Sequence, residues 1–140
     1  MTQDTLRVFE HTIEITHTWL NDLLERLAWR DQQRAYRALR AVLHALRDRL
    51  SVNDASHLAA QLPMLVRGFY YEGYHPGDKP LGERTKAEFL AHIKGEFADE
   101  SFDIETVTRA VTNVLAKHIT PGEVDKIKKS LPEDIRSLWS

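Results

Sequence analysis

Three residues near the start of the chain carry side chains that could bind a metal ion. His11, Glu14 and His17 follow one another at steps of three. On a helix this spacing turns the two imidazoles about 120° apart, whereas the histidines of a zinc-binding helix share one face at i and i+4. The chain has no cysteine, which excludes thiolate-bound zinc, iron–sulfur clusters and a thiol nucleophile. We therefore expect no metal ion and no cofactor.

A row of basic side chains follows between residues 30 and 47. At 100° per residue they occupy one broad sector of an expected helix. The row consists of Arg30, Arg34, Arg37, Arg40, His44 and Arg47. Planar guanidinium groups donate paired hydrogen bonds to carboxylates and phosphates. Two interpretations stay open: a solvated or interhelix face paired with acids of the same chain, or a surface that binds an acidic protein, a phosphate ligand or nucleic acid.

An aromatic cluster lies where the chain then meets a glycine- and proline-rich loop. It contains Phe69, Tyr70, Tyr71 and Tyr74, with Glu72 and His75 as polar neighbours. Tyrosine is typical of interfaces because its ring is apolar and its hydroxyl is polar. The rings could equally cover the core and hold the loop. The candidate interaction surface comprises Arg34, Arg37, Arg40, His44, Arg47, Tyr70, Tyr71, Glu72 and Tyr74.

Missing motifs, the net charge and the lack of long apolar runs argue against several classes of function. No phosphate-binding glycine loop, Gly-x-Ser-x-Gly elbow or dinucleotide fingerprint is present, so we expect no enzyme. The formal net charge of -2 argues against nucleic acid, because neutralising phosphates dominates such binding. No apolar run reaches the ~20 residues of a membrane span, and no signal peptide is recognisable. These features predict a cytoplasmic protein that does not enter membranes.

Apolar periodicity and helix-capping residues predict helices throughout, and no alternating run predicts a sheet. The first helix, over about residues 6–27, should turn one apolar stripe to the core. That stripe contains Leu6, Phe9, Ile13, Leu20, Leu24 and Leu27. A second apolar line, Val8, Ile15 and Trp19, lies nearly opposite and indicates either a central helix or a helix in an oligomer interface.

Further helix starts are marked by capping residues and prolines. The marks are Ser51 with Asp54, Pro63, Thr85 with Glu88, Asp103, Thr120 with Pro121 and Glu123, and Pro132. Between Pro63 and Thr85, residues 73–82 hold half of the glycines and two of the prolines. This segment is therefore expected to be a loop.

The two halves of the sequence align with each other at a constant offset of 69 residues. The offset superposes Ser51 on Thr120, Leu62-Pro63 on Leu131-Pro132, Arg67 on Arg136, and Tyr70 on Trp139. Upstream, an offset of 70 pairs Trp19-Leu20 with Phe89-Leu90. We predict an all-α helical bundle in a single domain, residues 1–140, built from two tandem, pseudo-symmetric four-helix repeats. The repeats cover about 1–72 and 85–140, with a loop at about 73–84, and Arg67 and Arg136 should be structural clamps.

Two long segments resemble a known family. Residues 34–50 read Arg-Ala-Tyr-Arg-Ala-Leu-Arg-Ala-Val-Leu-His-Ala-Leu-Arg-Asp-Arg-Leu, and His57–Pro63 runs on to the segment from Arg67 to Gly73. Both are similar to the bacterial DUF2267 family. The resemblance implies a small, helical, cytosolic bacterial protein, and it implies no activity, cofactor or catalytic residue. Members often carry tryptophan where this chain has Tyr74, which affects only the packing of the loop.

Together these observations favour a non-enzymatic protein-interaction or regulatory module. The expected partner is an acidic or mixed protein, or a second copy of the chain in a homo-oligomer. The alternative is nucleic-acid or phosphate-ligand binding through the arginine face.

Overall fold

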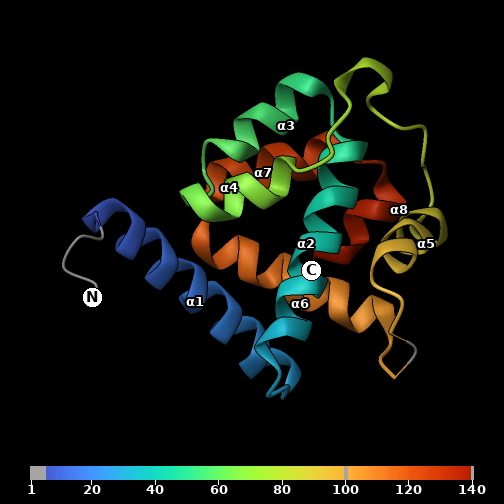
Figure 1. Ribbon diagram of the computed structural model, residues 1–140. Coiled ribbons are helices and arrows are strands. Elements are labelled where there is room, and N and C mark those ends of the chain that lie inside the picture. Colours follow the sequence, from blue (N-terminus) through green and yellow to red (C-terminus); the bar gives the residue numbers. More distant parts are fainter. Residues whose placement is uncertain (1–5, 100, 140) are drawn as a thin grey trace.

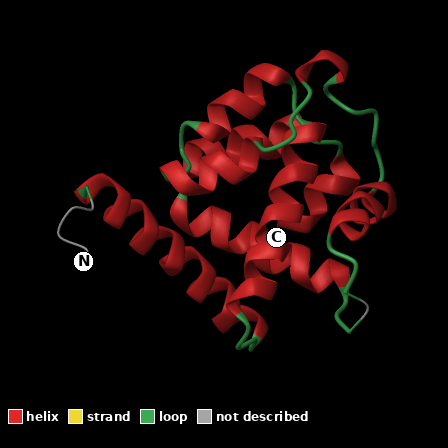
Figure 2. Ribbon diagram, in the orientation of Figure 1, coloured by secondary structure: helices red, strands yellow, loops and turns green. Residues whose placement is uncertain are grey.

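The computed structural model describes residues 6–99 and 101–139, which form an all-helical bundle (Figure 1). Figure 2 shows helices and loops, with no strand in these ranges. The helices are α1 (Arg7–Leu27), α2 (Gln32–Arg49), α3 (Val52–Ala59), α4 (Met64–Tyr71), α5 (Lys86–Glu96), α6 (Ile104–His118), α7 (Pro121–Ser130) and α8 (Glu133–Arg136). Short 3-10 helices occupy Pro76–Asp78 and Ser137–Trp139.

The second helix is the centre of the bundle. Ten of the eighteen residues of α2 are buried, because α1, α3, α4, α5 and α6 all pack against it. In the same way α6 contacts α1, α2, α5 and α7, and α3 lies against α7. The buried side chains form one cluster that extends from Trp19 to Trp139.

Capping explains where most of the helices begin. The Thr85 hydroxyl accepts from the backbone N–H of Glu88, whose carboxylate accepts from the N–H of Thr85, so this capping box is complete. At Thr120 only half of the expected box forms, because its N–H donates to the side chain of Gln61 at 3.1 Å instead of to Glu123. Pro63 is also not a first-turn residue. It is the N-cap of α4, one position before the first helical residue.

The first helix departs from the predicted apolar stripe. Leu6, Phe9 and Ile13 are 58%, 49% and 46% exposed, whereas Leu20 is buried. The stripe prediction is therefore wrong for the first half of α1. In Figure 1 the start of α1 extends past the other helices, in agreement with the exposure of these three side chains. We call residues 6–15 the arm.

The loop between α4 and α5 is fastened to the end of α2. The N–H of Leu81 donates to the carbonyl of Asp48 at 2.8 Å. His92 of α5 lies between two carboxylates, with Nδ1 2.8 Å from Glu83 and Nε2 3.5 Å from Asp48. The hydrogen bond to Asp48 raises the pKa of His92, and Glu83 adds to this effect against the opposing effect of burial. The histidine thus joins loop, α2 and α5 through a charge-dependent contact.

Candidate interaction surface

The basic row of α2 faces acids and carbonyl groups of the same chain. The Nε atom of Arg34 is 3.1 Å from the carboxylate of Asp99, and its guanidinium lies 4.8 Å from the ring centre of Phe102. Arg37 is exposed, and its guanidinium lies 5.8 Å from the ring centre of Phe97. Among the described residues Arg37 has no ion pair, which distinguishes it from Arg34.

Arg40 joins two carboxylates from different helices. Its Nη2 is 2.6 Å from Glu72, and its Nη1 is 3.2 Å from Glu96. The hydrogen bond with Glu72 raises the pKa of Arg40 and lowers that of the Glu72 carboxyl. The three side chains therefore form a charged cluster that ties the end of α4 to α5.

His44 and Arg47 bind the carboxyl-terminal end of α4. The Nε2 of His44 is 2.6 Å from the carbonyl oxygen of Phe69, and its Nδ1 is 2.9 Å from the carboxylate of Glu96. The Nη1 of Arg47 donates to the carbonyls of Tyr70 and Glu72 at 2.6 and 2.7 Å. The last carbonyls of a helix lack partners within it and carry partial negative charge. The buried end of α4 is thus satisfied by α2 side chains.

The tyrosines of the candidate surface are mainly packed inside. Tyr70 is buried, and its hydroxyl donates to the carbonyl of Ala55 at 2.7 Å. Tyr71 and Tyr74 are half-buried. The Tyr70 and Tyr71 rings meet edge to face with their centres 5.0 Å apart, and the Tyr71 and Tyr74 rings are tilted to each other with their centres 5.6 Å apart. The guanidinium of Arg47 lies 5.4 Å from the ring centre of Tyr74. Together the rings cover the core and hold the loop.

The structure therefore divides the predicted surface by accessibility. His44, Arg47 and Tyr70 are buried, and Arg34, Arg40, Tyr71 and Tyr74 are half-buried. Only Arg37 and Glu72 are exposed. They meet at a notch of about 260 Å³ lined by Tyr36, Arg37, Arg40, Glu72 and Glu96.

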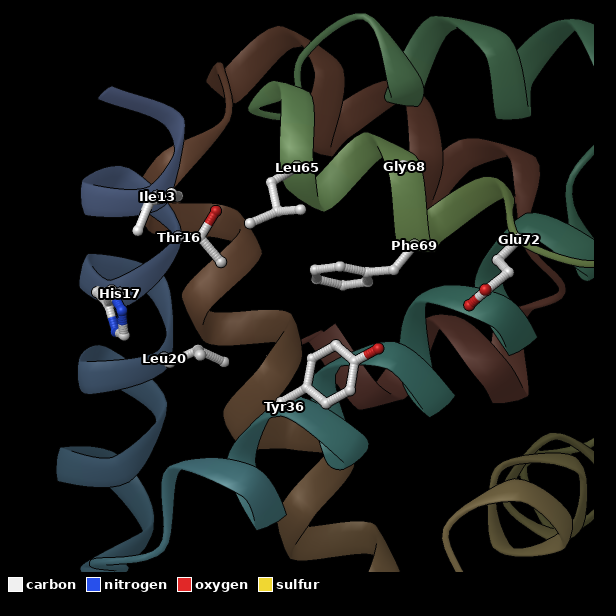
Figure 3. A pocket seen from close by; sticks show the side chains of 9 residues that line it. All are labelled: Ile13, Thr16, His17, Leu20, Tyr36, Leu65, Gly68, Phe69 and Glu72. Atoms are coloured by element: carbon white, nitrogen blue, oxygen red, sulfur yellow. The ribbon is translucent and has the colours of Figure 1, made fainter. Parts of the chain in front are cut away.

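An apolar groove of about 420 Å³ lies beside this notch, between α1 and α4. It is lined by Ile13, Thr16, His17, Leu20, Tyr36, Leu65, Gly68, Phe69 and Glu72. Figure 3 shows Leu65 and Phe69 of α4 opposite Thr16 and Leu20 of α1, with Tyr36 of α2 at the far end. Tyr36 and Glu72 line both the groove and the notch, so the two lie next to each other.

The groove stays open because small groups line part of its wall. Nothing lies within 4 Å of where a Cβ of Gly68 would be. Leu65 is 43% exposed beside it. The N–H of Leu65 donates to the hydroxyl of Thr12 at 2.9 Å, which fixes the start of α4 against α1. The walls are therefore joined at the end of the groove nearest the arm.

A second depression of about 340 Å³ lies on the other flank of α1. Its lining includes Val8, Ile15 and Trp19, which are the second apolar line of the sequence, together with Met64 of α4. Trp19 stacks on His118 with ring centres 4.9 Å apart, and Lys117 is 3.0 Å from Asp22. These contacts anchor the second half of α1 to α6, whereas the arm has apolar side chains exposed on both flanks.

A model of the family described as "Uncharacterized conserved protein (DUF2267)" matches residues 16–138. The chain belongs to this family. No curated protein matches the chain. The DUF2267 match includes the α2 and α4 walls of the groove and begins directly after the arm.

Within residues 6–99 and 101–139, no group of three or more histidine, aspartate and glutamate side chains is placed to hold a metal ion. Over the same residues, no helix has both the length and the apolar character that crossing a bilayer requires.

The first helix carried one sequence signal for the groove that the predicted interaction surface did not include. Apolar residues on two faces of the first helix indicated either a central helix or an interface, and the groove lies on one of those faces. Met64 and Leu65 gave no comparable signal, because an apolar run after a proline also suits a buried helix. Only Val66 of this run is buried.

Proposed function

We propose that this DUF2267 protein is a non-enzymatic interaction module, and that its α1–α4 groove binds the apolar face of a helix from a partner protein. The observation that carries the proposal is the row of large apolar side chains exposed beside the groove, namely Phe9, Ile13 and Leu65. Exposed apolar residues gathered around a concave site are typical of binding surfaces, and an amphipathic helix is the usual occupant of such a groove.

The polar notch supports a defined orientation of that helix. Arg37 is exposed at the notch and has no ion pair with a described residue. An acidic group on the partner would complement it, while the Arg40 cluster marks the polar limit of the groove. The partner is therefore of mixed character, with an apolar face and an acidic end.

The buried members of the candidate surface support the groove from behind. His44 and Arg47 bind the carbonyls at the end of α4, and Phe69 and Glu72 of that segment line the groove. In this proposal His44, Arg47 and Tyr70 position the α4 wall without touching the partner.

Nucleic-acid or phosphate binding through the arginine face has less support. Arg34 and Arg40 face carboxylates, and Arg47 faces carbonyls and Asp48. A phosphate would have to compete with these partners for the guanidinium groups. An arginine that is already paired within the chain adds little to the release of counterions from nucleic acid, which drives such binding. Arg30 and Arg37 are the members of the row that are exposed and have no ion pair with a described residue.

We also propose that residues 1–140 form a single domain of two tandem repeats. Arg67 and Arg136 make the same pair of carbonyl contacts, and Ser51 and Thr120 each cap a helix through the N–H three residues on. The packing of α1 on α6 has its counterpart in α5 on α2. The bacterial and cytoplasmic setting rests on the family resemblance.

Affinity purification with matched variants tests the proposed function. The tagged protein would be expressed in its native host as wild type, Leu65→Glu and Val52→Glu. Val52 is a large exposed apolar residue on α3, away from the groove. We expect wild type and Val52→Glu to co-purify with a bound protein that Leu65→Glu does not recover. An untagged copy of the same chain counts as such a bound protein. Equal recovery with all three would contradict the proposal.

A further inference from the structure

We propose that a pocket between α1 and α6 binds a small phosphate-bearing molecule, with the phosphate between Arg26 and Arg109. The pocket has a volume of about 310 Å³ and is lined by Arg26, Leu27, Thr106, Arg109, Ala110 and Asn113. It shares no lining residue with the α1–α4 groove. Binding at this pocket is therefore a function separate from partner binding in the groove.

The side chains that join α1 to α6 correspond to those that join α5 to α2. At the offsets of 70 and 69 residues, Asp22 and Lys117 correspond to His92 and Asp48. Asp22 is 3.0 Å from Lys117, and the Nε2 of His92 is 3.5 Å from Asp48. Each pair joins an acid to a base, with the two signs exchanged between the helices. At this level the chain balances its own charges in both places.

One turn further along α1 this balance is lost. Between α5 and α2, Glu96 lies 3.2 Å from Arg40. At the same offsets these two residues correspond to Arg26 and Arg109. An arginine thus occupies the place of the acid, and no described residue that lines the α1–α6 pocket is acidic. Because guanidinium groups pair with carboxylates and phosphates, an anion from solution can supply the missing negative charge.

Arg26 is the cation that leaves this level unbalanced. It is exposed in the last turn of α1 and has no ion pair with a described residue. The acid one turn before it, Asp22, binds Lys117 and His118 of α6 instead. The guanidinium of Arg26 can therefore pair with an anion without breaking an ion pair of the bundle.

Arg109 is held in position on the α6 side of the pocket. Its Nη2 is 2.8 Å from the carboxylate of Glu105, and its Nη1 donates to the carbonyl of Ser137 at 2.9 Å. Glu105 also lies 3.4 Å from Lys86, so one negative charge is shared between two cations. The Arg109 guanidinium is thus oriented, while Glu105 neutralises only part of the positive charge around it.

The other lining residues favour a phosphate monoester over a carboxylate. The Asn113 side chain is half-buried, and its amide makes no hydrogen bond with another described residue. A phosphate monoester has three terminal oxygens and a charge near −2 at neutral pH, which suits two guanidinium groups and an amide donor. A carboxylate has two oxygens and one charge. Leu27 is half-buried and Ala110 is buried, so they can contact an apolar part of the same ligand.

Heteronuclear NMR of the purified full chain tests the proposal. Glycerol phosphate is the probe, at about pH 7.5, where it is mainly doubly charged. We expect the side-chain amide signals of Asn113 to shift and to saturate with a dissociation constant of about 1 mM or tighter. The probe should also raise the urea midpoint of wild type, because only the folded chain binds it.

Variants at position 26 separate binding from folding. Arg26→Glu introduces the charge that Glu96 has at the corresponding position, so the chain should stay folded while binding weakens about tenfold or more. Arg26→Gln, which only removes the charge, should weaken binding about threefold or more. Arg7→Glu makes the same change of charge at the start of α1, away from the pocket, and should change binding by less than about twofold. Circular dichroism would establish that each variant is folded.

Three results would overturn the proposal. One is the absence of a saturable shift at Asn113 up to about 10 mM glycerol phosphate. The second is an equal loss of binding in Arg26→Glu and Arg7→Glu, which would indicate attraction by the overall charge alone. The third is a shift at Asn113 that acetate or a single-stranded oligonucleotide produces at a lower concentration than glycerol phosphate does. That shift would assign the pocket to carboxylates or to nucleic acid.

Discussion

Arg67 and Arg136 bind the carbonyl oxygens eight and five residues before them in the chain. The Nε of Arg67 donates to Ala59 and its Nη2 to Leu62, both at 2.8 Å. Arg136 makes the corresponding bonds at 2.7 and 2.9 Å. Each guanidinium thus fastens the end of one helix to the next, as the sequence predicted for structural clamps.

We expect Arg67→Ala and Arg136→Ala each to lower the free energy of unfolding by about 1–3 kcal/mol, because two half-buried carbonyls lose a charged donor. Lysine should restore little, since it lacks the planar fork. Urea denaturation would measure these changes. Arg30→Ala is the control, since Arg30 is exposed and should change stability by less than about 0.5 kcal/mol. A clamp variant no less stable than Arg30→Ala would contradict the assignment.

Arg47 and Arg37 provide a matched pair on one helix. Arg47 is buried and binds the carbonyls of Tyr70 and Glu72, whereas Arg37 is exposed. We expect Arg47→Met to lower the free energy of unfolding by about 2–4 kcal/mol, because it leaves buried polar groups unpaired. Arg37→Met should change it by less than about 0.5 kcal/mol.

Urea denaturation measures both variants, and hydrogen exchange should show faster exchange over residues 73–84 in Arg47→Met alone. Similar losses in the two variants would mean that Arg47 does not hold the end of α4.

His92 makes stability depend on pH. Its pKa is raised in the folded chain, chiefly by the hydrogen bond with Asp48. The folded state therefore binds the proton more tightly than the unfolded state does. The resulting stabilisation is fully present below about pH 6.5, the ordinary histidine value, and is lost as the pH rises through the raised folded value.

We therefore expect the difference in free energy of unfolding between wild type and His92→Gln to shrink as the pH rises from about 5.5 to 8.5. Urea denaturation across this range is the measurement. His11→Gln is the control, because His11 is exposed on the arm. A difference that stays constant, or grows, with rising pH would show that the His92 contact does not carry this effect.

Oligonucleotide binding should be weak. Arg34, Arg40 and Arg47 are already engaged within the chain, and the net charge is negative. By fluorescence anisotropy at about 0.15 M salt, we expect a dissociation constant no tighter than about 10⁻⁴ M, the weak end of the range for nonspecific binding. Micromolar binding that falls steeply with salt and is lost in Arg37→Ala would favour the nucleic-acid alternative.

The helices could be predicted because their determinants are local. Thr85 and Glu88 cap the helix that their spacing predicted, and Asp103 caps the next one as expected. The error at Thr120 also has a physical cause. The N–H of Thr120 binds Gln61, 59 residues away, and no local pattern predicts a partner at that distance.

The candidate site could be predicted only in part. Periodicity places Phe9 and Ile13 on one face of a helix, but it does not say whether another element covers that face. The same limit applies to the basic row. Its spacing identified His44 and Arg47 as neighbours, whereas their partners at the end of α4 depend on how α2 and α4 pack. The groove between α1 and α4 arises from that packing.

The central claim is that the α1–α4 groove contacts another protein chain. A photoreactive benzophenone amino acid at position 65, inside the groove, tests it most directly when the full chain is irradiated in its native host. We expect a covalent adduct with a second chain at position 65 and none with the same label at position 52. No adduct at position 65, or the same adduct at both positions, would contradict it.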